Sequence, residues 1–175
     1  VDSSENSAST VYVFDNDGEI VSEYLVPLSN IKIPLENGKG VITCAGDITL
    51  IGNEAFLSCD KLLTITIPQS VKSIEERAFW GCSSLESITL PDAVTTIRER
   101  AFEDCKALKS VVLPQSLESI GICAFSDTAL ENVQLPSQLK TIGASAFLDC
   151  TSLSSVSMQE GIETIEVGAF RRCTA

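Results

Sequence analysis

The dipeptide Ala-Phe recurs along this chain at a nearly constant spacing. Its six copies begin at positions 55, 78, 101, 124, 146 and 169, so successive copies lie 23, 23, 23, 22 and 23 residues apart. Six of the seven phenylalanines in the 175 residues belong to these copies, and only Phe14 lies outside them. Such a period predicts a chain of stacked structural repeats, because each unit repeats one supersecondary element.

Each unit carries further apolar positions at fixed offsets from Ala-Phe. Cysteine follows the phenylalanine by three residues in five units, and a leucine and an alternating apolar pair come next. The pattern Leu-x-x-Ile-x-Ile is typical of a short strand, and the proline after it ends the strand because proline cannot donate a ladder hydrogen bond. The small alanine beside phenylalanine favours a tight helical turn. One unit cannot bury its apolar face alone, so stacking must bury the columns.

The pattern therefore predicts a repeat solenoid over residues 39–175, with about six units of 23 residues. The unit L-x-x-I-x-I-P-x-x-V-x-x-I-x-x-x-A-F-x-x-C-x-x-L resembles the BspA-like, Treponema pallidum-type leucine-rich repeat. The resemblance implies a right-handed α/β leucine-rich-repeat fold. We expect a parallel sheet on its concave face, with one strand per unit, and short helical or 3-10 turns on its convex face.

The N-terminal part of the chain is not repetitive. Residues 1–10 are polar and rich in serine, and we expect a disordered leader there. Residues 11–14 and 19–26 are rich in β-forming residues, and the Asp-Asn-Asp-Gly sequence at 15–18 predicts a hairpin turn between them. Residues 11–38 are accordingly predicted to form a hairpin that caps the first repeat.

The same acidic turn contains a fragment of a calcium-binding loop. Asp15 and Asp17 precede a glycine, as in such loops, but Val13 and Tyr24 stand where a complete loop has acidic ligands. A hairpin turn is therefore the preferred interpretation, and calcium binding is the alternative.

Composition excludes several classes of chemistry. The net charge of −12 disfavours nucleic acid as a partner, because an acidic surface repels phosphates. The chain has no histidine, which removes histidine-based nucleophile pairs and histidine metal ligands, and it has no C-x2-C pair for zinc. No stretch of 18 apolar residues exists, so no membrane span is predicted in this chain. We expect no catalytic, cofactor-binding or metal site.

The seven cysteines are predicted to be free thiols. Five of them share the position three residues after phenylalanine, where a small apolar side chain fits a buried column, and Cys44 takes an inward strand position. Cys123, directly before an Ala-Phe copy, is expected to be the most accessible. Disulfides between neighbouring units remain an alternative, and three pairings are open on spacing: Cys59–Cys82, Cys82–Cys105 and Cys150–Cys173.

Two surfaces are candidates for binding. On the predicted concave strands, the residues that flank the central apolar position point outward. They form two columns of mostly small, uncharged side chains: Thr64, Ser87, Ser110, Asn132 and Ser155, and beside them Thr66, Thr89, Val112, Gln134 and Ser157. On the convex side, the position after phenylalanine holds Leu57, Trp80 and Leu148. The alternatives are strand propensity with solubility for the first set, and packing between turns for the second.

The predicted function is a non-catalytic protein-binding or adhesion module. The family that the repeat resembles consists mostly of bacterial surface or secreted proteins implicated in adhesion and host contact. The resemblance thus implies an extracellular or cell-surface location and a protein ligand, with host extracellular proteins as candidates. The alternative is a structural spacer that displays other domains of a longer surface protein. The candidate columns carry no aromatic residue, so we expect binding by this segment alone to be weak or multivalent.

Overall fold

The N-terminal strands form the predicted hairpin. The computed structural model describes residues 8–14, 20–27, 39–40 and 49–175, with side chains described for 49–175. Strands β1 (Ala8–Phe14) and β2 (Ile20–Pro27) pair antiparallel. Because β1 starts at Ala8, the last three residues of the predicted leader belong to this strand instead. The turn with the calcium-loop fragment lies outside the described residues.

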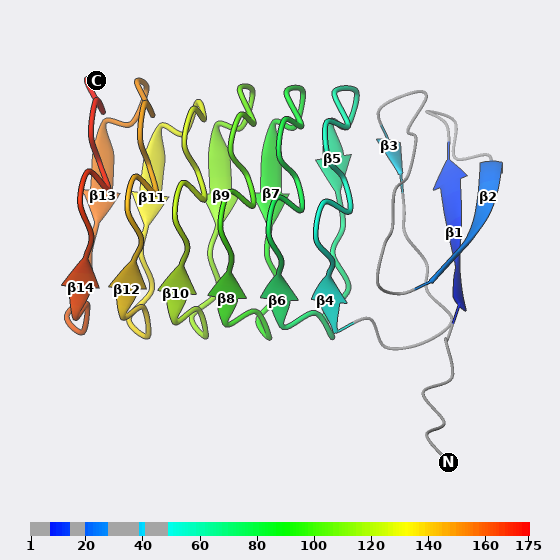
Figure 1. Cartoon of the computed structure of the whole chain (residues 1–175), viewed down its shortest axis with the longest axis horizontal. Coiled ribbons are helices and arrows are strands. Elements are labelled where there is room, and N and C mark those ends of the chain that lie inside the picture. The colour runs from blue at the N-terminus through cyan, green and yellow to red at the C-terminus, as the bar shows by residue number, and fades with distance from the viewer. Residues whose placement is uncertain (1–7, 15–19, 28–38, 41–48) are drawn as a thin grey trace, which may run out of the picture.

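The repeats form parallel rungs that stack along the longest axis of the molecule (Figure 1). One ladder is a continuous six-stranded parallel sheet of β4 (Leu50–Ile51), β6 (Ser73–Ile74), β8 (Thr96–Ile97), β10 (Ser119–Ile120), β12 (Thr141–Ile142) and β14 (Thr164–Ile165). A second row holds β3 (Lys39–Gly40), β5 (Thr64–Ile65), β7 (Ser87–Thr89), β9 (Ser110–Val112), β11 (Asn132–Gln134) and β13 (Ser155–Ser157). These strands pair in parallel as β3–β5, β7–β9 and β11–β13. Strand β1 contacts β3, so the hairpin adjoins the first rung.

The predicted parallel solenoid is confirmed, but each unit contributes two strands and not one. The Leu-x-x-Ile-x-Ile segments form the interrupted row, whereas the continuous sheet runs through the isoleucine that precedes Ala-Phe by four residues. A β-branched isoleucine preceded by serine or threonine in five of the six strands favours extended backbone there. An isoleucine four residues before each Ala-Phe is visible in the sequence, but we predicted no strand there.

Successive turns replace the predicted helical or 3-10 segments, and the described residues contain no helix. In the second rung, Ala78 N–H donates to the Glu75 carbonyl at 3.2 Å and Trp80 N–H to the Arg77 carbonyl at 3.1 Å. Two positions in each rung have left-handed backbone. One lies directly before alanine and holds Glu54, Arg77, Arg100, Cys123, Ser145 and Gly168. The other lies two residues after phenylalanine and holds Ser58, Gly81, Asp104, Asp127, Asp149 and Arg172. Left-handed residues cannot continue a right-handed helix, so the chain bends at each of them.

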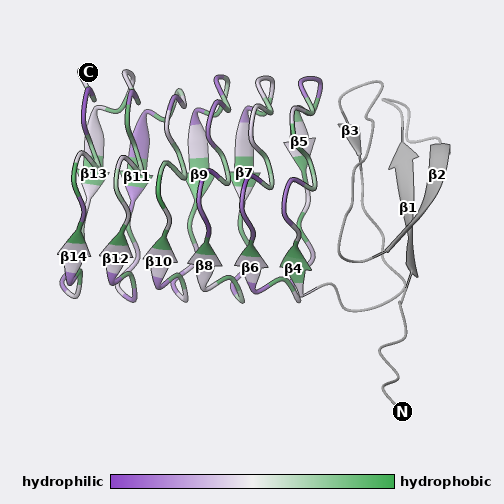
Figure 2. Cartoon of the chain, in the orientation of Figure 1, coloured by the Kyte–Doolittle hydropathy of each residue, from purple (hydrophilic) through white to green (hydrophobic). Residues whose placement is uncertain are grey.

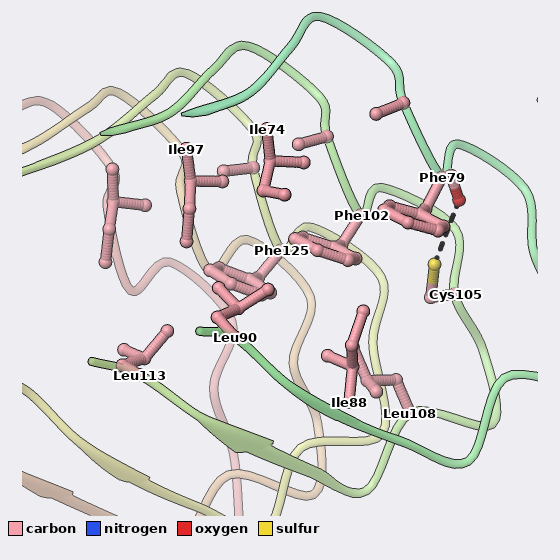
Figure 3. Close-up of a cluster of buried hydrophobic side chains, with 14 of the residues drawn as sticks. Ile74, Phe79, Ile88, Leu90, Ile97, Phe102, Cys105, Leu108, Leu113 and Phe125 are labelled. Carbon is pink, nitrogen blue, oxygen red and sulfur yellow. Dashed lines mark hydrogen bonds between the residues drawn. The ribbon is translucent and has the colours of Figure 1, made fainter. Parts of the chain in front are cut away.

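The core is built from columns that run along the solenoid (Figure 3). The six Ala-Phe rings stack face to face, with neighbouring centroids 4.8–5.3 Å apart and planes within 9° of one another. Phe79 and Phe102 are fully buried, as the repeat predicts. The last rung is more open, because Ile165 has 49 % exposure whereas Ile142 in the preceding rung has none.

Candidate functional site

The ten residues of the predicted concave columns lie together on one face of the solenoid. They belong to β5, β7, β9, β11 and β13, except Thr66, which follows β5 directly, and all ten are exposed. The residue between each flanking pair is buried or half-buried, as the period of two in a strand requires. We call these ten positions the exposed strand face. Figure 2 shows β11 of this row as hydrophilic, whereas the strands of the opposite ladder end in hydrophobic residues.

Uncharged hydrogen-bonding groups dominate this face. Nine of its ten side chains end in a hydroxyl or an amide, and the tenth, Val112, is 57 % exposed. Neighbouring rungs hold these groups in register, so that the Ser155 hydroxyl donates to Asn132 Oδ1 at 2.5 Å. Hydroxyls and amides both donate and accept hydrogen bonds, which suits contact with uncharged polar groups such as peptide bonds.

A pocket of about 390 Å³ opens on this face at β9 and β11. Its lining comprises Val111, Val112, Leu113, Gln115, Gln134, Leu135, Ser137 and Gln159. Val112 and Gln134 belong to the predicted columns, whereas the contributions of Gln115, Ser137 and Gln159 were not predicted. Gln115 and Ser137 each follow a proline that ends a strand segment, and Gln159 stands at the equivalent proline position itself. The rim of this face thus lies at the proline positions of the repeat, and Gln115 and Gln159 add long polar side chains there.

The predicted convex contact residues are only half-exposed. Leu57, Trp80 and Leu148 all have intermediate burial. The Trp80 side chain hydrogen-bonds the carboxylate of Glu103, which occupies the same position in the next rung. Burial is the main influence on that carboxylate and raises the pKa of Glu103 above its usual value. This contact between rungs favours packing over ligand binding for Trp80.

Free thiols link consecutive rungs in the described part of the chain. Cys82, Cys105, Cys123, Cys150 and Cys173 are free thiols, and Cys44 lies outside the described residues. The Sγ of Cys82, Cys105, Cys150 and Cys173 each donates to the phenylalanine carbonyl of the preceding rung, at 3.1–3.2 Å. The predicted burial of this column holds for the inner rungs, but Cys59 and Cys173 in the end rungs are half-buried, like Cys123.

The 22-residue unit contains a local substitution for this arrangement. Thr128 stands in the cysteine column, and its hydroxyl donates to the carbonyl of Phe125 in its own rung at 2.9 Å. A second pocket, of about 420 Å³, lies at this unit, and its lining includes Lys106 of the preceding unit and Thr151 of the following unit. The 22-residue unit has no residue at the repeat position that Lys106 and Thr151 occupy, so the pocket lies where one residue is missing.

Within residues 49–175 no metal-binding group is found. The side chains described there include no cluster of three or more Cys, Asp or Glu residues arranged to hold a metal ion. Over the part of the chain that the structure describes, no helix is long and apolar enough to cross a membrane.

Parallel rungs, stacked phenylalanines and a leucine column define a leucine-rich-repeat solenoid. The profile of the BspA type leucine rich repeat region matches residues 49–175 in six copies, and the chain belongs to this family. None of the curated proteins compared with the chain matches it significantly.

Three solved structures illustrate the likeness. The chain is similar to the T. pallidum leucine-rich repeat protein (32% identity, TM-score 0.78, covering 94% of this chain and 75% of that chain). It is also similar to a leucine-rich repeat protein from Bacteroides ovatus (36% identity, TM-score 0.71, 94% and 44%). The pneumococcal vaccine antigen PcpA is a third (27% identity, TM-score 0.58, 67% and 28%). The chain spans less than half the length of the last two proteins.

Proposed function

We propose that this chain is a non-catalytic protein-binding module of a cell-surface or secreted bacterial protein. The observation that carries the proposal is the exposed strand face, where ten outward side chains form two continuous columns, nine of them uncharged and polar. A rigid scaffold of stacked rungs holds these groups at fixed spacing, which lowers the entropic cost of binding an extended partner surface.

The family supports an extracellular setting for this module. Among the similar structures, PcpA is described as a pneumococcal vaccine antigen. On this likeness we propose host extracellular proteins as the partners of this chain. The formal net charge of −12 makes a neutral or basic partner surface the better electrostatic match.

The exposed strand face lacks the groups that dominate tight interfaces. It carries no tryptophan, tyrosine or arginine, the residues most enriched among binding hot spots. Binding by a single chain should therefore be weak, and several chains on one surface would strengthen it through avidity.

The test is a binding screen with matched variants. The protein is displayed multivalently on beads and exposed to purified matrix and serum proteins, and any binding is compared with that of the double variant Ser87→Lys/Asn132→Lys. A control variant, Ser83→Lys/Thr164→Lys, adds the same two charges at exposed positions away from this face, since Ser83 lies in a turn after Ala-Phe and Thr164 lies in β14 of the opposite ladder. We expect specific binding that the first variant abolishes and the control retains. No binding to any protein would overturn the proposal and favour the spacer function.

A further inference from the structure

Backbone pairing along the exposed strand face is interrupted between β9 and β11. The residue after β7, Leu90, donates its N–H to the last carbonyl of β9 at 3.1 Å, and Leu135 donates likewise to the last carbonyl of β13 at 2.9 Å. Among the backbone hydrogen bonds of the described residues, the equivalent bond from Leu113 to the last carbonyl of β11 is absent. β5 and β7 are likewise unpaired, but the interruption at β9 and β11 coincides with the pocket on this face.

The pocket joins an apolar wall to an amide rim. Leu113 and Leu135 are buried and Val112 is exposed beside them, so a hydrophobic side chain entering here would contact aliphatic carbons. Three glutamines, Gln115, Gln134 and Gln159, are exposed around the same space. Each amide offers two donor hydrogens and one acceptor oxygen, the same groups that a peptide bond requires in return.

The charge of the pocket restricts what it can hold. None of its lining residues is ionisable. A charged group that entered would lose hydration without gaining an opposite charge, and that desolvation is costly. The volume of about 390 Å³ is within the usual range for sites that take small ligands or single side chains.

We propose that this pocket anchors an uncharged, extended peptide segment of a protein partner. One apolar side chain of the segment packs against Val112, Leu113 and Leu135. The peptide groups on either side of it form hydrogen bonds with the glutamine amides, with the backbone N–H of Leu113 and with the backbone carbonyl of Gln134. The last two groups do not bond each other. The inference rests on the proposed protein-binding function and assigns its specificity to one place on the exposed strand face.

The probe is a capped amino acid, N-acetyl-leucine methylamide, titrated into the protein while methyl NMR signals are recorded. We expect saturable shifts of the Val111, Val112, Leu113 and Leu135 methyl groups. N-acetyl-lysine methylamide and N-acetyl-glutamate methylamide should bind at least about tenfold more weakly. A tenfold loss of affinity corresponds to only about 1.4 kcal/mol, and desolvating a charged group without a partner costs more than that. Maltotriose, a neutral polar ligand without peptide bonds or an apolar side chain, should leave these signals unchanged.

Matched variants locate the site. Val112→Lys places a charge in the pocket, whereas Thr89→Lys places the same charge at the register-paired exposed position of β7, outside the lining. Val112→Lys should weaken the capped leucine by about tenfold or more and Thr89→Lys by less than about twofold. Unchanged methyl spectra elsewhere and an unchanged Tm establish that both variants are folded.

Several results would overturn the inference: equal effects of the two variants, equal binding of the charged probes, shifts produced by maltotriose instead of the peptide, or no shift at all. Its failure is separable from that of the proposed function. A protein partner that is lost with Ser87→Lys/Asn132→Lys but bound normally by Val112→Lys would leave the function intact and remove only this anchor.

Discussion

The Sγ of Cys105 donates a hydrogen bond of 3.1 Å to the carbonyl oxygen of Phe79 in the preceding rung (Figure 3). The same carbonyl accepts the backbone N–H of Cys82 within its own rung, also at 3.1 Å. Each inner thiol of this column thus satisfies a buried backbone acceptor and fills the space beside the phenylalanine stack. The cysteines stabilise the stacking of rungs as free thiols, without covalent cross-links.

Thiol accessibility should follow position along the solenoid. Native protein treated with a thiol reagent should be labelled only at the half-buried Cys59, Cys123 and Cys173 among the described cysteines, whereas Cys82, Cys105 and Cys150 should react after unfolding. Peptide mass spectrometry measures the order of labelling. Rapid native labelling of Cys105, or a disulfide between any two cysteines of the column, would contradict this assignment.

Stability should fall at alkaline pH. Burial raises the pKa of Cys150 to about 11 and that of Cys59 to about 12, from a normal value of 9.0. Between pH 9 and these values the unfolded chain releases thiol protons that the folded chain retains, so the free energy of unfolding decreases as pH rises through this range. Urea denaturation at pH 7.5, 9 and 10.5 measures the change. A Cys150→Val variant should lose less stability over the same range, and equal losses would exclude a contribution from this thiol.

The phenylalanine stack should contribute more at its centre than at its end. Phe102→Ala removes a fully buried ring stacked on both sides, and we expect a loss of about 3–5 kcal/mol in the free energy of unfolding. Phe170→Ala, at the half-buried end of the stack, should cost less. Chemical denaturation compares the two variants. A loss below about 1 kcal/mol for Phe102→Ala would mean that the ring does not fill the core.

Backbone conformation should limit substitution before each Ala-Phe. Cys123 has a φ of 53°, in the left-handed region, where a β-branched side chain is strained. Cys123→Val should therefore destabilise by about 1–2 kcal/mol, whereas Cys123→Asn should be nearly neutral because asparagine tolerates this region. Thermal unfolding of both variants is the measurement. Similar Tm values for valine and asparagine would contradict the left-handed assignment.

The period of the repeat was enough to predict the stacked parallel rungs, the buried phenylalanines and the exposure of the ten columnar residues. Each of these depends on a residue type that returns at the same place in the unit. The continuous six-stranded sheet was not predicted because its strands are two residues long, too short to show alternation. The pocket was missed because it depends on the interrupted pairing between β9 and β11, which no column of identical residues encodes.

The left-handed positions were also hidden from the sequence. Glycine occupies only Gly81 and Gly168 among the twelve, and the others are Glu, Arg, Asp, Ser and Cys, which give no consistent signal of positive φ. Bonds to neighbouring rungs hold these residues in place, as when Arg77 N–H donates to the Glu99 carbonyl at 3.0 Å. Stacking therefore overrides the local preference of the residue.

The exposed strand face is the surface that we propose to bind protein. Amide hydrogen exchange of the chain, alone and saturated with the partner found by the binding screen, tests it most directly. We expect slower exchange over residues 64–66, 87–89, 110–112, 132–134 and 155–157, strongest at β9 and β11, with the Ala-Phe turns unchanged. Protection confined to the Ala-Phe turns around Leu57, Trp80 and Leu148, with no change in these strands, would contradict it.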